Sequence, residues 1–201
     1  MFVTDSKTNI SADCKTLAPI WEQVASDFQY DSDVLIAKVD CEAPNAKAVA
    51  QDAGVKSYPT INFYPKGSKE AIPYTGGRSQ ADIITFMNDK AGTHRMPGGG
   101  LDTIAGTIPS LDELVSGLKT GGNAAYEELA KAAAAVSDKY AEYYSKVAKK
   151  AEDNSGYVEK EINRLQNILK KGGLAPEKID DLMSRSNILS KFRGDAAKDE
   201  L

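Results

Sequence analysis

The spacing of apolar residues in the first half of the chain switches between helical and strand-like periods. Residues 14–24, CKTLAPIWEQV, place apolar side chains three or four positions apart, which predicts a helix with one buried face. Residues 34–39, VLIAKV, form a short β-branched run that is typical of a buried strand. Residues 45–54, NAKAVAQDAG, predict a second helix that ends at its glycine.

Two strands and one helix complete this half. TINFY at 60–64 and AIPYTG at 71–76 are predicted to pair as antiparallel strands across the turn PKGSKE, and SQADIITFMNDK at 79–90 as a helix. The predicted order is therefore helix, strand, helix, strand, strand, helix. This order indicates an α/β unit with a mixed sheet.

The composition changes at residues 94–106, HRMPGGGLDTIAG. A proline and three consecutive glycines there are incompatible with the interior of a helix or strand, so this segment marks a domain boundary. We divide the chain into an atypical N-terminal segment at 1–13, a partial α/β domain at 14–91, a Gly/Pro-rich linker at 92–109, a helical domain at 110–193 and a tail at 194–201.

The second half is helical throughout. Ser110 and Glu113 have the spacing of a capping box at a helix start. A long helix is predicted over 123–150, because its apolar and aromatic residues alternate in steps of three and four. The positions of this stripe are 126, 129, 133, 136, 140, 143 and 147. We interpret its tyrosines as core; a surface that binds other proteins is the alternative.

Two further helices carry stripes of the same spacing. One contains Val158, Ile162 and Leu165 and ends at Gly172, and the other begins at Pro176. The stripes are expected to face one another in a compact antiparallel bundle, because glycines interrupt the pattern. An intermolecular coiled coil is the alternative. We expect the helical domain to fold independently.

Composition and charge narrow the possible functions of the 201 residues. The formal net charge is -4 and no basic run is interleaved with aromatic residues, so we do not expect a nucleic-acid partner. No window of eighteen apolar residues exists, so we expect no membrane span. There are two cysteines and one histidine, which match no metal motif, and no Gly-rich phosphate loop follows a strand. We therefore expect no cofactor.

The two ends of the chain give opposite indications about localisation. The start, MFVTDSKTNIS, lacks the apolar core of a secretory signal. The last four residues, Lys198, Asp199, Glu200 and Leu201, are the retention signal of the endoplasmic reticulum. We give more weight to the C-terminal signal, so the expected location is the lumen of the endoplasmic reticulum and the KDEL receptor is an expected partner.

Four motifs together resemble one family. CKTLAPIWEQVA, IAKVDCE, GVKSYPTINFY and YTGGRS resemble the catalytic thioredoxin-like domain of protein disulfide isomerases, in the family's order. The helical part resembles the C-terminal domain of fungal and plant disulfide isomerases, shared with Windbeutel-type chaperones. The resemblance implies a thioredoxin-like domain, truncated at its N-terminus, before a helical bundle. It also implies thiol–disulfide exchange on unfolded or disulfide-bonded secretory clients.

The resemblance assigns roles to individual residues. Cys14 corresponds to the second cysteine of the family's Cys-Gly-His-Cys site, and the nucleophilic cysteine falls on Ser11. Pro59 corresponds to the cis-proline that faces the site, and Arg78 to the arginine that helps the second thiol to ionise. Lys38 corresponds to the buried strand lysine. Its acidic partner falls on Asp5, a correspondence to which we give low weight.

The residues at the site predict impaired chemistry. Thiol–disulfide exchange needs a thiolate, and the hydroxyl of Ser11 stays protonated. Asp13 places negative charge beside Cys14 and favours its neutral thiol, unless Arg78 reaches the site. Cys14 alone forms only a mixed disulfide, because no thiol lies three residues away to release it. We interpret Cys41 as a small buried residue; it could serve as the second thiol only at a Cα separation under about 7 Å.

Two further expectations concern the N-terminal segment. Asn9, Ile10 and Ser11 form an N-glycosylation sequon, which is either a modification site or a chance match. The polar segment 1–13 is predicted to lack the central strand of the fold, a loss of about 8 to 15 kcal/mol. The thioredoxin-like part is then expected to fold poorly, and the edge of the strand 34–40 to recruit a partner or aggregate.

Three functions are compatible with these observations. The first is a disulfide isomerase of the endoplasmic reticulum, impaired in this chain because Ser11 replaces the nucleophilic cysteine. The second is a redox-inactive chaperone module that binds clients through the helical domain and the surface near Pro59. The third is an inactive truncated product.

Overall fold

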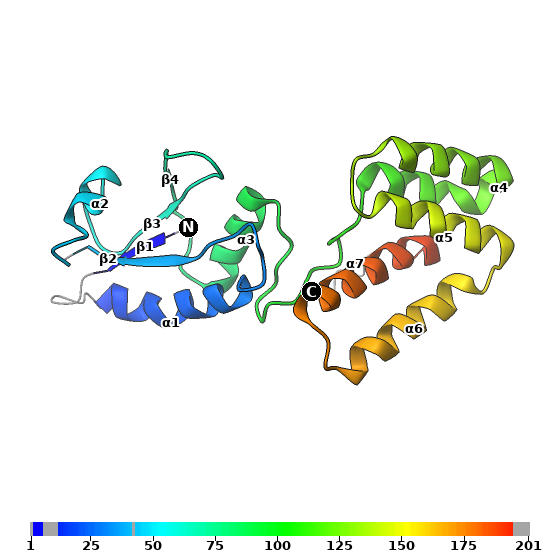
Figure 1. Ribbon diagram of the computed structural model, residues 1–201. Helices are drawn as coiled ribbons and strands as arrows, with labels where there is room; N and C mark the ends of the chain where they lie inside the picture. Colours follow the sequence, from blue (N-terminus) through cyan, green and yellow to red (C-terminus); the bar gives the residue numbers. More distant parts are fainter. Residues whose placement is uncertain (1, 6–11, 42, 195–201) are drawn as a thin grey trace. The chain divides into compact units, whose positions relative to one another are not determined.

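The structure is a computed structural model that describes residues 2–5, 12–41 and 43–194, without the side chains of 2–5 and 119–121. The chain divides into two compact units, Met1–Gly100 and Leu101–Leu201. The first unit is α/β and the second is all-helical (Figure 1), which confirms the predicted fold class. No helix in the described ranges has the length and apolarity that crossing a membrane requires.

The described residues of the first unit form a four-stranded mixed sheet with three helices. The strands lie in the order β2-β1-β3-β4; β1 is parallel to β2 and antiparallel to β3, which is antiparallel to β4. In chain order the elements are β1 (Phe2–Asp5), α1 (Ala12–Asp27), β2 (Ala37–Asp40), α2 (Lys47–Asp52), β3 (Thr60–Phe63), β4 (Ile72–Pro73) and α3 (Gln80–Ala91).

The prediction that no strand precedes the site helix is wrong. The residues FVTD form β1, in which Val3 is paired with Lys38 of β2 on one side and with Ile61 of β3 on the other. The sequence pattern missed this strand because it has only four residues and polar residues follow it. The estimated loss of a central strand therefore does not apply, and β1 covers the inner edge of β2.

The core of the first unit lies where α1 and α3 pack against the sheet. The buried side of α1 carries Leu17, Trp21 and Val24, and Phe28, one residue past the end of α1, continues this alternating three- and four-residue spacing. This stripe contacts buried residues of β3 and α3, namely Ile61, Phe63, Ile83, Ile84 and Met87. The face of α1 that begins at Cys14 is therefore the face that stabilises the unit.

The first part of the predicted linker is fixed to the end of α1. Arg95 is only 4% exposed; its guanidinium donates to Asp31 at 2.6 Å and to the carbonyl of Gly99 at 2.8 Å. The buried carboxylate of Asp27 accepts from the backbone N–H of Gly98 at 3.0 Å. Because a buried charge without a partner is costly, these contacts hold the glycine segment on the first unit.

Residues 101–194, the described part of the second unit, form four helices. Gly122 interrupts the helical geometry of the first of them with φ 57° and ψ −157°. The elements are α4 (Pro109–Ala135), α5 (Ala141–Asp153), α6 (Tyr157–Lys171) and α7 (Pro176–Arg193). The predicted end of a helix at Gly172 and start of the next at Pro176 are confirmed.

Two predictions about the helices are wrong. The capping box of Ser110 and Glu113 is not formed, because α4 begins at Pro109 and has no side-chain cap. The predicted helix over 123–150 is broken between α4 and α5. There the carboxylate of Asp138 accepts from the backbone N–H of Tyr140 at 2.7 Å, a local bond that competes with helix formation.

The apolar stripes of the second unit meet within the chain. The side chain of Tyr144 is fully buried; its hydroxyl accepts from the N–H of Ile108 at 3.0 Å and donates to Asp112 at 2.5 Å. Burial is the main cause that raises the pKa of Tyr144, so this hydroxyl remains a donor. Asp112 also pairs with Lys191 of α7 at 3.1 Å, which ties the start of α4 to α5 and α7.

We predict that Val3→Pro selectively unfolds the first unit. A proline in β1 removes a backbone donor from a strand that is paired on both sides and leaves its acceptor without a partner, which should cost roughly 1 to 3 kcal/mol. Trp21, the single tryptophan, is buried in this unit, so its fluorescence during urea denaturation reports the loss. Lys69→Pro, in the exposed connection between β3 and β4, is the control. Equal midpoints for the two variants would show that β1 is dispensable.

Candidate functional site

The start of α1 carries the thiol predicted to be catalytic. Cys14 lies in the first turn of α1 and is 4% exposed. It occupies the first position of the stripe that continues with Leu17 and Trp21, so helical spacing places it on the core side. A buried thiol is not accessible to a protein disulfide, because exchange requires direct contact between sulfur atoms.

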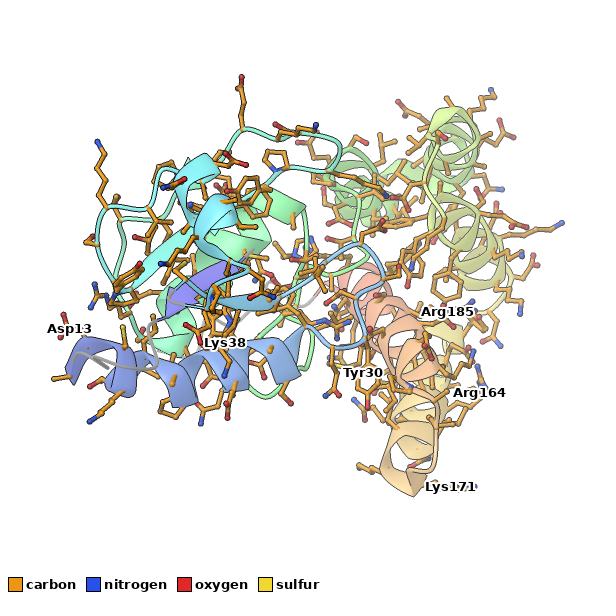
Figure 2. The ribbon with its side chains drawn as sticks, turned by 60° about the vertical axis from the view of Figure 1, so that its left-hand side comes forward. Asp13, Tyr30, Lys38, Arg164, Lys171 and Arg185 are labelled. Atoms are coloured by element: carbon orange, nitrogen blue, oxygen red, sulfur yellow. The ribbon has the colours of Figure 1, made fainter. Side chains whose placement is uncertain are left out.

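Arg78 reaches the start of α1 through Asp13. The guanidinium Nη1 of Arg78 lies 3.4 Å from Oδ2 of Asp13, and both side chains are about half exposed or more. Figure 2 shows Asp13 at the outer end of α1. The negative charge next to Cys14 is therefore paired. Exposed pairs of this kind stabilise a fold by only about 0 to 1 kcal/mol.

The motif YTGGRS is a tight turn that sets the position of Arg78. The hydroxyl of Tyr74 donates to the carbonyl of Gly77 at 2.5 Å, and burial raises the pKa of that hydroxyl, which remains protonated. A Cβ on Gly76 would lie 2.6 Å from the tyrosine hydroxyl, and one on Gly77 would collide with the carboxylate of Asp82. A side chain at either glycine would therefore displace Tyr74 or Asp82 from these contacts.

The same turn begins α3. The hydroxyl of Ser79 accepts from the backbone N–H of Asp82 at 3.2 Å, and the carboxylate of Asp82 accepts from the N–H of Ser79 at 3.3 Å. This reciprocal pair is a capping box. The sequence analysis did not identify Tyr74 or the two glycines as positioning residues; the double glycine before an arginine was the available signal.

The cis-proline and the second cysteine lie near β3 and α2. The peptide bond between Tyr58 and Pro59 is cis, as the resemblance implied, and directly precedes β3. A hollow of about 480 Å³ is lined by residues that include Cys41, Lys47 and Tyr58. Cys41 is buried, as predicted, and neither cysteine forms a disulfide. Cys41 therefore does not pair with Cys14 in this structure.

The prediction that Lys38 is buried is wrong. Its side chain is 53% exposed and its ammonium lies 3.8 Å from the carboxylate of Glu22 on α1. Figure 2 shows Lys38 on the strand next to α1. The physical reason is the position of β2 at the end of the sheet order, where its side chains reach solvent. Asp5 lies in β1, opposite Asp40 in the register.

Several predicted residues lie outside the described part of the chain. These are Asn9, Ser11, Lys198, Asp199, Glu200 and Leu201. Their roles remain predictions from the sequence. Among the described residues, no group of three His, Cys, Asp or Glu side chains could hold a metal ion.

The chain matches two domain families. Residues 5–89 match the family described as Thioredoxin. Residues 106–192 match the family described as Endoplasmic reticulum protein ERp29, C-terminal domain. The two matches follow one another in the order of the α/β unit and the helical unit.

Similar proteins come from fungi and plants. The chain is 57% identical over 190 residues to protein disulfide-isomerase tigA of Aspergillus niger, which covers 94% of this chain and 52% of the relative. It is 50% identical over 198 residues to protein disulfide-isomerase erp38 of Neurospora crassa, across 94% of this chain and 53% of the relative. Identity to the probable protein disulfide-isomerase A6 of Medicago sativa is 38%, across 89% of this chain and 50% of the relative. The chain thus spans about half the length of these relatives.

We predict that Gly77→Ala destabilises the first unit by about 1 kcal/mol, the usual contribution of a helix cap, because its methyl group displaces Asp82 from the capping box. The urea midpoint of Trp21 fluorescence measures this loss. Gly100→Ala is the matched control, since a Cβ there meets no atom within 4 Å. A Gly77→Ala midpoint as high as that of the control would show that the turn adapts freely.

Proposed function

Because the chain belongs to the protein disulfide-isomerase family, we propose that it is a folding factor that binds secretory clients and has impaired thiol–disulfide exchange. The observation that carries this proposal is the state of Cys14. This thiol is 4% exposed in the first turn of α1, and position 11 is a serine. The proposal concerns this chain, which spans about half of its relatives.

The chemistry of thiol–disulfide exchange explains why one thiol cannot complete the reaction cycle. In the first step a thiolate attacks a client disulfide, forms a mixed disulfide and expels the other client sulfur as a thiolate. In the second step a neighbouring thiolate attacks the enzyme's sulfur and releases the reduced client. Ser11 cannot perform either step, because its hydroxyl remains protonated. A chain with Cys14 alone therefore stops at the mixed disulfide, even when local opening exposes the sulfur.

Client binding is supported by apolar side chains that the first unit leaves exposed. Tyr58 precedes the cis-proline and is 39% exposed. Val49 of α2 is also an exposed large apolar residue, and other residues of α2 line the hollow that contains Tyr58. Such side chains contribute to binding of unfolded polypeptides, which expose apolar segments of their own. The surface near Pro59 is accordingly the proposed client-binding surface of this unit.

The proposed location is the lumen of the endoplasmic reticulum. The last four residues, Lys198 to Leu201, have the sequence of the retention signal, which the KDEL receptor recognises. Unfolded and disulfide-bonded secretory proteins are the clients available in that compartment. In the same compartment the sequon at Asn9 becomes accessible to glycosylation.

A second candidate function is slow exchange by Cys14 alone. The ion pair between Arg78 and Asp13 favours it, because it neutralises the negative charge beside the thiol. An inactive product has less support, because β1 completes a sheet on which α1 and α3 form a continuous core.

We predict that the chain reduces insulin disulfides no faster than its Cys14→Ala variant. Ser11→Cys restores the second sulfur and should raise the rate of insulin reduction at least about tenfold, since a dithiol can release the mixed disulfide. Suppression of client aggregation is measured on the same three proteins. It should be equal in all of them, because binding does not involve the thiol.

Two outcomes would contradict this proposal. Insulin reduction by the natural chain well above Cys14→Ala would favour exchange by a single thiol. Absence of aggregation suppression, in a chain whose Trp21 fluorescence shows a folded first unit, would favour the inactive product.

A further inference from the structure

The helical unit contains a cleft lined by tyrosines and charged residues from α5, α6 and α7, which we call the tyrosine cleft. Figure 1 shows these three helices next to one another. The volume of the cleft is about 430 Å³. The residues that line it include the tyrosines Tyr140, Tyr143 and Tyr157 and the cations Lys139, Lys150 and Arg185.

The acidic side chains of the tyrosine cleft are already neutralised by salt bridges. Glu142 pairs with Lys146 at 2.8 Å, and Asp181 pairs with Arg185 at 2.9 Å. Glu161 accepts two hydrogen bonds from Arg164, each at 2.7 Å. Arg164 and Arg185 come from α6 and α7 (Figure 2). The carboxylates of the cleft therefore have little remaining capacity to attract a cation.

The pKa of Glu161 supports a positive local potential. The hydrogen bond from Arg164 is the main cause that lowers the pKa of this carboxyl, and the charges of Lys150 and Arg185 lower it further. Burial acts in the opposite direction and is outweighed. Glu161 is therefore ionised and paired, and the field around it is set by cations.

Two lysines of the cleft lie over aromatic rings instead of pairing with carboxylates. The ammonium of Lys139 lies 4.7 Å from the ring centre of Tyr140, and that of Lys150 lies 5.1 Å from the ring centre of Tyr157. Within the described ranges neither lysine forms a salt bridge. A chain with a net charge of -4 thus concentrates unneutralised positive charge in this cleft.

The hydroxyl of Tyr143 adds an unused hydrogen-bond donor. It is buried and has no hydrogen-bond partner among the described residues, a condition that destabilises the folded state. Arg185 lies over its ring, 5.0 Å from the centre. Burial is the main cause that raises the pKa of Tyr143, so the hydroxyl keeps its proton and needs an acceptor. A ligand that brings an oxygen into the cleft would supply one.

We propose that the tyrosine cleft binds an acidic segment of a client polypeptide. Carboxylates of the segment pair with Lys139 and Lys150, and the hydroxyl of Tyr143 donates to an oxygen of the bound chain. The two lysines are eleven residues apart along α5 and its start, or about 16 Å at helical rise. An extended polypeptide covers that distance in about five residues, so two acidic residues at that spacing reach both lysines.

This inference rests on the proposed function, because it names the feature of a client that the helical unit recognises. It assigns acidic segments to the second unit, in addition to apolar segments at the surface near Pro59. The three tyrosine rings give the backbone of the bound segment an apolar surface to lie on.

The test measures binding of a dansyl-labelled Gly/Ser-rich peptide with two glutamates about five residues apart, by fluorescence anisotropy with the full chain. We expect Lys139→Gln combined with Lys150→Gln to weaken binding at least about tenfold and to reduce its salt dependence. The matched control is Lys170→Gln combined with Lys171→Gln, which removes the same charge at the far end of α6 (Figure 2). It should change the affinity less than about twofold.

The Tyr143→Phe variant distinguishes a role of this hydroxyl in peptide binding from a role in the stability of the fold. Removing a buried hydroxyl that has no partner should leave helical circular dichroism and the unfolding temperature unchanged or slightly raised. The same variant should weaken peptide binding about threefold or more, through loss of a hydrogen bond. A fall in stability with unchanged binding would assign Tyr143 a structural role and overturn the proposal.

Other outcomes also overturn it. These are equal binding of a glutamine-substituted peptide, an unchanged affinity in the double lysine variant, and inorganic phosphate binding as tightly as the peptide, which would indicate a small-anion site. Client aggregation assays keep this failure distinct from that of the proposed function. If the natural chain suppresses aggregation but the substitutions in the cleft leave the affinity for the peptide unchanged, only the inference about the cleft fails.

Discussion

The backbone pairing of β1 with two strands at once is the constraint on which the first unit depends. In the described part of the chain β2 and β3 are not paired with each other, and each is paired with β1. The four residues Phe2 to Asp5 therefore connect the two sides of the sheet. The assembled sheet then gives α1 and α3 a surface to cover, and their buried stripes meet there. The position of Cys14 follows from this, because α1 can pack in only one rotation about its axis.

Helical periodicity places Cys14 on the same face of α1 as the apolar side chains that stabilise the first unit. The spacing that buries Leu17 and Trp21 also buries Cys14, and a buried thiol is protected from exchange. The turn that carries Arg78 still reaches the start of the helix, where the arginine pairs with Asp13. The thioredoxin-like unit thus holds one buried thiol, that of Cys14, at the start of α1. In the helical unit, by contrast, polar and aromatic groups gather in an open cleft with an unsatisfied hydroxyl, as expected of a binding surface.

The sequence predicted those features that depend on local rules. Glycine and proline define the ends of α6 and α7, and the apolar stripe of α1 defines its buried face. Features that leave no periodic pattern or that depend on distant contacts were missed or wrong. β1 is too short to show a period, a local hydrogen bond from Tyr140 to Asp138 forms in the break between α4 and α5, and Lys38 is exposed because its strand is the outermost. The tyrosine cleft requires side chains from three helices, so the tyrosine stripe alone could not reveal the cations around it.

The central claim is that Cys14 belongs to the core and not to an accessible catalytic site. The most direct measurement is the rate of alkylation of Cys14 by iodoacetamide, followed by peptide mass spectrometry in the native and the urea-unfolded chain. Cys41, which is equally buried, provides an internal reference. The account predicts that Cys14 reacts at least about 100-fold more slowly in the native chain and in step with Cys41, because both require opening of the fold. Native alkylation of Cys14 near the unfolded rate, with Cys41 still protected, would contradict it.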